Sequence, residues 1–178
     1  MTTSRFLELA RSSDVQLEQI LRASKAPALE SLVGHEWCGC NTSWRLKVMG
    51  LQKFIKGFFR QGERVEGYNI PVQQNGLDAP WLDQPTVESP KRFAFYVVTP
   101  VDLESRDNFY QGAILLNYGA SPRNAASGIE RLIRDYLVQP DLHNPDLLLG
   151  KAYLAIGTLR LPSNFFILER LRLTEWRP

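Results

Sequence analysis

The chain has 178 residues, of which 44% are hydrophobic and 22% are charged, and its formal net charge is +2. This composition is typical of a globular protein and excludes a low-complexity or strongly charged disordered chain. The mild positive charge does not favour a nucleic-acid partner, because nucleic-acid binders concentrate far more Lys and Arg on one face. We therefore expect one domain over residues 1–178, with a helical segment at 1–33 packed on a β-barrel at 34–178.

Charged residues interrupt the N-terminal stretch, where a secretory signal would need an apolar run: they are Arg5, Glu8, Arg11 and Asp14. No segment approaches the roughly 18 consecutive apolar residues that a spanning helix requires. We expect a cytoplasmic protein with no integral membrane span.

The N-terminal segment predicts two short helices, one around Leu9 and one around Leu17. Ser13, followed three residues later by Gln16, predicts a capping box at the start of the second helix.

From Glu36 onward, the pattern becomes typical of strands. Residues 44–49 alternate apolar and basic side chains, which predicts a strand with one buried face. Residues 51–58 instead place their apolar side chains at helical spacing, which predicts a short helix on the sheet or over its mouth.

The remaining elements are mostly extended. Further strands are predicted at 64–72, 91–99, 110–118, 147–156 and 165–173. Residues 73–90 predict a long irregular loop, and residues 126–136 a short amphipathic helix that could lead into a strand at 136–139. Seven or eight strands without βαβ alternation predict a mainly β fold, an antiparallel up-and-down barrel with N-terminal helices.

The later strands are apolar on both faces. Phe93, Phe95 and Val97 occupy one side of their strand, and Ala94 and Tyr96 occupy the other. In an antiparallel sheet the second apolar face must be covered by helices, by a partner or by a ligand. The pattern therefore supports either a ligand pocket or a face covered by the N-terminal helices.

The pocket hypothesis selects a set of candidate ligand-binding residues. They are Phe93, Phe95, Tyr96, Tyr118, Tyr153 and Glu169. Glu169 shares a predicted strand face with apolar residues, where a carboxylate must be paired or solvated, so it could hold the polar end of a ligand. The alternative is a glutamate at the end of the strand, beyond the core.

Basic residues are concentrated between positions 45 and 64, where Glu63 is the one acid. They are Arg45, Lys47, Lys53, Lys56, Arg60 and Arg64. They could attract an anionic head group or a membrane surface at the mouth of the cavity, or simply form a solvated face.

Catalytic and metal motifs are weak in this sequence. His35, Cys38 and Cys40 carry zinc-ligating groups, but their spacing does not match the common zinc fingers, so we expect buried reduced thiols and no metal. The chain has no Gly-rich phosphate loop, Gly-x-Ser-x-Gly elbow or His-Glu-x-x-His helix. We expect no cofactor, and a non-enzymatic protein is favoured although catalysis stays open.

Two stretches resemble a known group. The segment LVGHEWCGCNTSW at 32–44 resembles the opening of lipocalin-like (calycin) barrels and of the bacterial Gly-x-Trp-x-Gly proteins. YLVQPDLHNPDLLLGKAYLAIG at 136–157, followed by NFFILERL at 164–171, resembles the closing strands of the latter group. The middle of the chain matches poorly.

The match at the Trp motif is incomplete. Trp37 and Gly39 fit, but His35 occupies the position of the first glycine. The resemblance implies that Trp37 packs at a closed barrel end beneath a basic residue of the last strand, either Arg170 or Arg172, and that it is not catalytic.

Three functions remain open. The first is binding of a small hydrophobic molecule, of the fatty acid, isoprenoid or tetrapyrrole class, in an apolar barrel cavity. The second is a small-molecule enzyme of the cyclase, isomerase or lyase type that uses the same cavity, marked by a polar cluster with perturbed titration. The third is a structural protein whose exposed sheet face binds a partner or forms a homodimer.

Overall fold

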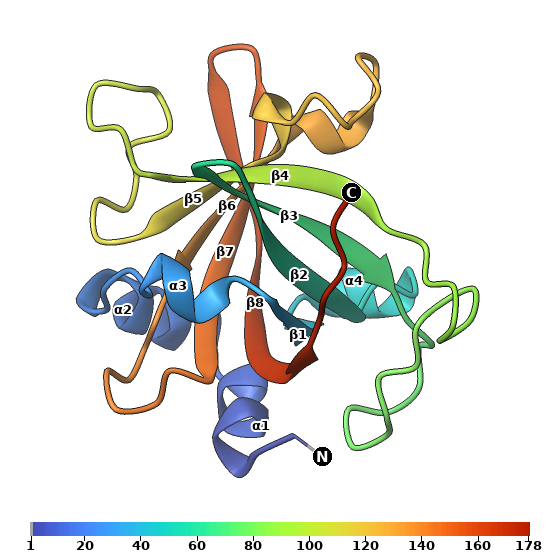
Figure 1. The fold of residues 1–178 in the computed structure, drawn as a ribbon. Helices are drawn as coiled ribbons and strands as arrows, with labels where there is room; N and C mark the ends of the chain where they lie inside the picture. Colours follow the sequence, from blue (N-terminus) through green and yellow to red (C-terminus); the bar gives the residue numbers. More distant parts are fainter. Residues whose placement is uncertain (1) are drawn as a thin grey trace.

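Eight antiparallel strands form a closed barrel in the computed structural model, which describes residues 2–178 (Figure 1). The strands are β1 His35–Asn41, β2 Lys53–Gln61, β3 Arg64–Pro71, β4 Phe93–Pro100, β5 Ile114–Asn117, β6 Ile133–Val138, β7 Leu147–Ile156 and β8 Leu159–Leu173. Each strand pairs with the next in the chain, and β8 pairs with β1 to close the barrel. The predicted fold class, a mainly β up-and-down barrel of lipocalin-like topology with short N-terminal helices, is confirmed.

The helices are short and form no part of the barrel wall. They are α1 Ser4–Arg11, α2 Asp14–Ala23, α3 Leu29–Leu32, α4 Trp44–Val48 and the 3-10 helices η1 Tyr118–Ala120 and η2 Ile129–Leu132. The predicted capping box is present, because the Ser13 side chain accepts from the Gln16 backbone N–H and the Gln16 side chain accepts from Ser13. Within residues 2–178, no helix is long and apolar enough to cross a membrane.

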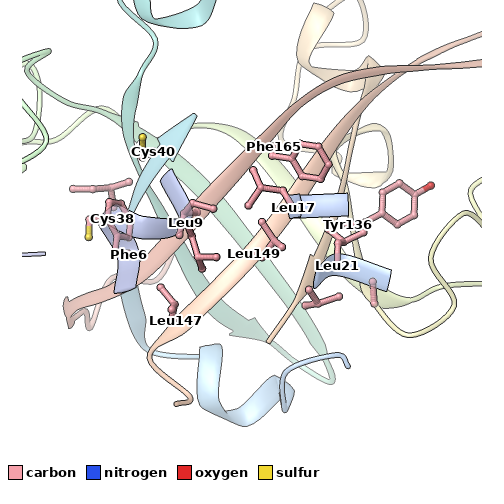
Figure 2. Close-up of a cluster of buried hydrophobic side chains, with 14 of the residues drawn as sticks. Phe6, Leu9, Leu17, Leu21, Cys38, Cys40, Tyr136, Leu147, Leu149 and Phe165 are labelled. Atoms are coloured by element: carbon pink, nitrogen blue, oxygen red, sulfur yellow. The ribbon is translucent and has the colours of Figure 1, made fainter. Parts of the chain in front are cut away.

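Helices α1 and α2 cover part of the outer face of the barrel. Figure 2 shows Phe6 of α1 and Leu17 of α2 in one buried apolar cluster with Cys38, Leu149 and Phe165 of the barrel strands. Elsewhere, the C-terminal tail covers the wall. The apolar outer face of these strands is therefore covered by the chain itself, while their inner face surrounds the lumen.

The helix predicted over 51–58 is wrong, because this segment forms β2. Phe54, Lys56 and Phe58 point into the barrel, whereas Ile55 and Phe59 belong to the outer core. A strand with apolar side chains on both faces loses its alternating pattern, and its apolar residues can then coincide with helical spacing.

The strand predicted over 44–49 is also wrong, because these residues form α4 in the connection between β1 and β2. The helix leaves Trp44 and Val48 69% and 78% exposed. An alternation over six residues cannot specify a strand when no neighbouring strand is available to pair with it.

The helix predicted over 126–136 is reduced to the single 3-10 turn η2, and the chain becomes extended at Ile133. Ile129, which an amphipathic helix over this segment would bury, is 78% exposed. Pairing with β5 and β7 determines the conformation of this segment, because both neighbours satisfy the backbone of β6.

One end of the barrel is filled by side chains. Trp37, Phe58, Tyr96 and Leu168 pack there with further apolar residues in the inner core. The Tyr96 ring lies directly over Gly67, where an added Cβ would come within 2.3 Å of the ring. These side chains fill this end, and the cavity of the barrel lies toward the opposite end.

Candidate functional site: the cavity of the barrel

The unfilled half of the barrel forms a cavity of about 600 Å³. Its wall is mainly apolar and includes Phe54, Phe93, Ile133, Leu154 and Phe166, with Leu46 and Leu51 of the α4 segment at the mouth. A volume of this size is within the range of roughly 300–1,000 Å³ that holds one drug-sized molecule. The barrel can thus hold a ligand.

The six predicted site residues do not come together. Phe93 and Tyr118 contribute side chains to the cavity wall. Tyr153 borders the cavity, but its ring packs in the outer core, where its hydroxyl is hydrogen-bonded to that of Tyr110. Tyr96 lies inside the barrel but in the packed end, where its hydroxyl donates to the Gly57 carbonyl oxygen at 3.1 Å. Phe95 is on the outer surface, where its ring stacks on Trp176 with centroids 6.2 Å apart.

Glu169 also lies outside the cavity, because it points outward from β8. Its carboxylate accepts hydrogen bonds from the backbone N–H of Thr3, at 3.0 Å, and from the Thr3 hydroxyl, at the N-terminus of α1. A carboxylate near a helix N-terminus is stabilised by the unpaired N–H groups and the helix dipole. In the structure, Glu169 therefore helps to attach α1 to the barrel.

The polar group of the cavity is a cluster of four buried side chains, of which only Tyr118 was predicted from the sequence as a ligand-binding residue. Lys56 of β2 and Asp135 of β6 form an ion pair with Nζ 2.9 Å from Oδ2, and their side chains are 3% and 5% exposed. Asn69 of β3 lies beside Lys56 in the strand register, and Tyr118 follows β5 directly. We call Lys56, Asn69, Tyr118 and Asp135 the lumen cluster.

Hydrogen bonds connect all four members of the lumen cluster. The Lys56 ammonium donates to Asn69 Oδ1 at 3.1 Å, to the Tyr118 hydroxyl and to Asp135 Oδ2. The Tyr118 hydroxyl donates to Asp135 Oδ2 at 2.9 Å. Asn69 Nδ2 donates to the Ala94 carbonyl oxygen at 2.9 Å and to the Tyr118 oxygen at 3.3 Å. A network of this kind compensates the desolvation of its polar groups only when its members remain together.

Burial perturbs the acid–base properties of the cluster. Burial lowers the pKa of Lys56, and this effect exceeds the opposing effect of the charge and hydrogen bond of Asp135. Burial, followed by the negative charge of Asp135, raises the pKa of Tyr118 well above its ordinary value. Tyr118 therefore keeps its proton at neutral pH and acts as the donor to Asp135.

Aromatic rings surround the ammonium of Lys56. Its Nζ lies 4.9 Å from the ring centroid of Tyr96, 5.1 Å from that of Tyr118 and 5.3 Å from that of Phe166. Ring faces attract a cation at such distances, and more strongly where water is excluded. Together with Asp135, the rings stabilise the charged form of Lys56 in an otherwise apolar lumen.

The two wrong helix predictions explain why the ion pair of Lys56 and Asp135 in the lumen was missed. Lys56 lies in the segment 51–58 and Asp135 in the segment 126–136, and a helix would have placed each on a solvent-facing side. In a strand, Lys56 alternates with Phe54 and Phe58, and Asp135 alternates with Ile133 and Leu137. A charged residue between two inward apolar residues of a barrel strand was the available signal.

The six basic residues between positions 45 and 64 do not form one face. Lys56 is in the lumen, whereas Lys53 is on the outer side, with its Nζ 3.8 Å from the Trp81 ring centroid and hydrogen-bonded to the Gly76 and Ala79 carbonyl oxygens. Arg60 pairs with Glu30. The expected single basic surface is therefore divided between the two sides of the wall.

The cysteines are buried beneath α1 on the outer face of β1. Burial raises the pKa of Cys38 to about 12 and that of Cys40 to about 11, which leaves both as neutral thiols at neutral pH. Among the residues that the structure describes, no group of three or more His, Cys, Asp or Glu side chains is arranged to hold a metal ion.

The closed end carries the contact that the family resemblance implied. Arg170 of β8 lies over Trp37, with its guanidinium carbon 4.9 Å from the ring centroid, while Arg172 pairs with Glu36. The resemblance named both arginines, and the structure selects Arg170.

The chain matches no protein-family model, no curated protein and no solved structure. Its function must therefore be inferred from the residues of the cavity itself.

Proposed function

We propose that the protein binds a small hydrophobic molecule in the open half of its barrel. The observation that carries the proposal is the cavity of about 600 Å³, whose mainly apolar wall holds the buried lumen cluster. An apolar wall supplies affinity and a few placed polar groups orient the ligand. The arrangement suits one elongated molecule with a polar end directed toward Asp135.

We also infer kinship with the lipocalin-like barrels and the Gly-x-Trp-x-Gly proteins. Support comes from the barrel topology and from Trp37, which packs beneath Arg170 at the filled end. Fold does not determine function, so this kinship supports a binding role only in combination with the cavity.

Native mass spectrometry of protein purified gently from its own cells would test the binding role. We expect a copurified apolar molecule at about one per chain, released by mild denaturation. Binding of Nile red, a neutral dye, provides a second measurement on the emptied protein. The proposal would be overturned if no molecule copurifies and the emptied protein also does not bind the dye.

A cavity-filling variant locates the binding. Ala152 lines the cavity, so Ala152→Trp should weaken dye binding by about tenfold or more, because the new ring occupies the ligand space. Ala126→Trp is the matched control, since Ala126 is exposed in a loop. Equal dye binding by the two variants would place the dye outside the lumen.

Catalysis in the same cavity is the second candidate, because the lumen cluster has the perturbed titration expected for that alternative. In this case Asp135 would act as a general base on a bound substrate. The two functions differ in stoichiometry: incubation with a small-molecule extract of the source cells would consume many equivalents of substrate if the protein is an enzyme. A binding protein would deplete about one equivalent and release it unchanged.

A further inference from the structure

The lumen cluster has no unused hydrogen-bond donor. The three N–H groups of the Lys56 ammonium are directed to Asn69, Tyr118 and Asp135. The one proton of Tyr118 is donated to Asp135, and the amide nitrogen of Asn69 has two acceptors. A ligand that needs a donor from this cluster must first break one of these bonds.

Among the described residues, one oxygen of the lumen cluster has no protein donor. Asp135 Oδ2 accepts from both Lys56 and Tyr118, but within residues 2–178 no protein donor reaches the other oxygen, Oδ1. Asp135 lines the cavity, and its Oδ1 is not among the fully enclosed unpartnered atoms. An ionised carboxylate has about four acceptor sites, so Oδ1 retains free lone pairs toward the lumen.

Building on the proposed function, we propose that the cavity recognises its ligand through a hydroxyl or neutral N–H group that donates to Asp135 Oδ1. The apolar remainder of the ligand would lie against Phe54, Phe93 and Leu154 toward the mouth. The matching class is neutral, elongated alcohols and amides, which includes isoprenoid alcohols. Of the ligand classes predicted from the sequence, free fatty acids are disfavoured by this donor requirement, because they are ionised at neutral pH.

Electrostatics give the reason for that selection. A ligand carboxylate placed at the base of the cavity would face the Asp135 carboxylate without a free N–H group of Lys56 to compensate it. Two neighbouring carboxylates repel each other, and the repulsion is stronger in a lumen of low dielectric constant. The cluster is neutral as a whole because Lys56 and Asp135 cancel, so it gives a second anion no net attraction.

Displacement of Nile red by three probes with the same carbon chain tests the proposal. Lauryl alcohol carries a donor, lauryl methyl ether has the oxygen without the donor, and laurate carries a carboxylate. A hydrogen bond to a charged group corresponds to roughly tenfold to a hundredfold in affinity. We expect lauryl alcohol to displace the dye at concentrations lower by that factor than either of the other probes.

A double variant assigns the effect to the lumen cluster. Lys56→Met combined with Asp135→Leu replaces the buried ion pair by apolar side chains, a change that proteins often tolerate. The variant should still bind Nile red, but should no longer distinguish lauryl alcohol from its methyl ether. Retained discrimination would place the recognition elsewhere and overturn the proposal.

The remaining outcomes separate this inference from the proposed function. If wild-type protein binds the dye and laurate displaces it as well as lauryl alcohol does, the donor rule is wrong but the binding role stands. If the ether equals the alcohol, the donor rule is again wrong. If wild-type protein binds neither the dye nor any probe, the binding role itself fails.

Discussion

Removal of Lys56 alone should destabilise the protein far more than removal of the whole Lys56–Asp135 pair. The change is Lys56→Met, which keeps most of the side-chain volume but deletes the ammonium. Asp135 then stays 5% exposed with a hydrogen bond from Tyr118 as its only remaining described partner, and Asn69 Oδ1 loses its donor. A buried carboxylate without its counter-charge is strongly disfavoured.

The expected cost follows from the burial of both partners. Breaking a buried ion pair from one side typically costs about 3–5 kcal/mol. The bond from Tyr118 to Asp135 survives, so we expect the lower part of this range, about 3 kcal/mol. For a chain of this length that corresponds to a fall in Tm of about 6–12 °C.

The double variant, Lys56→Met with Asp135→Leu, is the matched comparison. It leaves no uncompensated charge, and buried pairs replaced by apolar side chains are often neutral or stabilising. Tyr118 loses an acceptor, so we expect stability within about 2 kcal/mol of the wild-type protein. Urea unfolding monitored by circular dichroism, at constant m value, measures both variants. A single variant as stable as the wild type would refute the assignment of a buried, charged pair.

Three further predictions concern the outer wall and the filled end. Burial raises the pKa of Glu18, but the hydrogen bond and charge of Lys151 outweigh this effect, so the pKa is lowered overall. The contact therefore stabilises α2 at pH values above the pKa of an unfolded glutamate and is lost as the pH falls below about 4. The Tm difference between wild type and Glu18→Gln should shrink as the pH falls through this range. Arg170→Met should reduce the free energy of unfolding by about 0.5–2 kcal/mol in urea titration, because Trp37 loses its cation contact; no change would contradict this role. The Cys38 thiol, whose pKa burial raises to about 12, should react with Ellman's reagent only on unfolding, and fast reaction of the native protein would show that α1 does not cover it.

Several elements could be predicted because their patterns are local. The N-terminal helices and their capping box depend on contacts within a few residues, and β3 and β7 are bounded by turn residues on both sides. The family resemblance also led to the Trp37–Arg170 contact, although it left Arg172 as an alternative. For these features, neighbouring residues in the sequence carry most of the structural information.

Other elements depended on partners far away in the chain. Whether 51–58 becomes a helix or a strand depends on pairing with β1 and β3, because its apolar residues satisfy both patterns. Glu169 could be recognised as a carboxylate on an apolar face, but its partner Thr3 is 166 positions away. No local pattern reports such a contact.

The amino-acid sequence by itself determined the fold class of this protein, since strands that are apolar on both faces can bury both only by closing around one another and against the N-terminal helices. The tertiary structure alone decided which charged side chains enter the lumen. Lys56 and Asp135 are 79 positions apart and meet because closure of the barrel brings β2 and β6 to opposite sides of one cavity. The energy of a buried ion pair depends on the distance between the two charged groups and on the exclusion of water. Both are set only when the barrel closes.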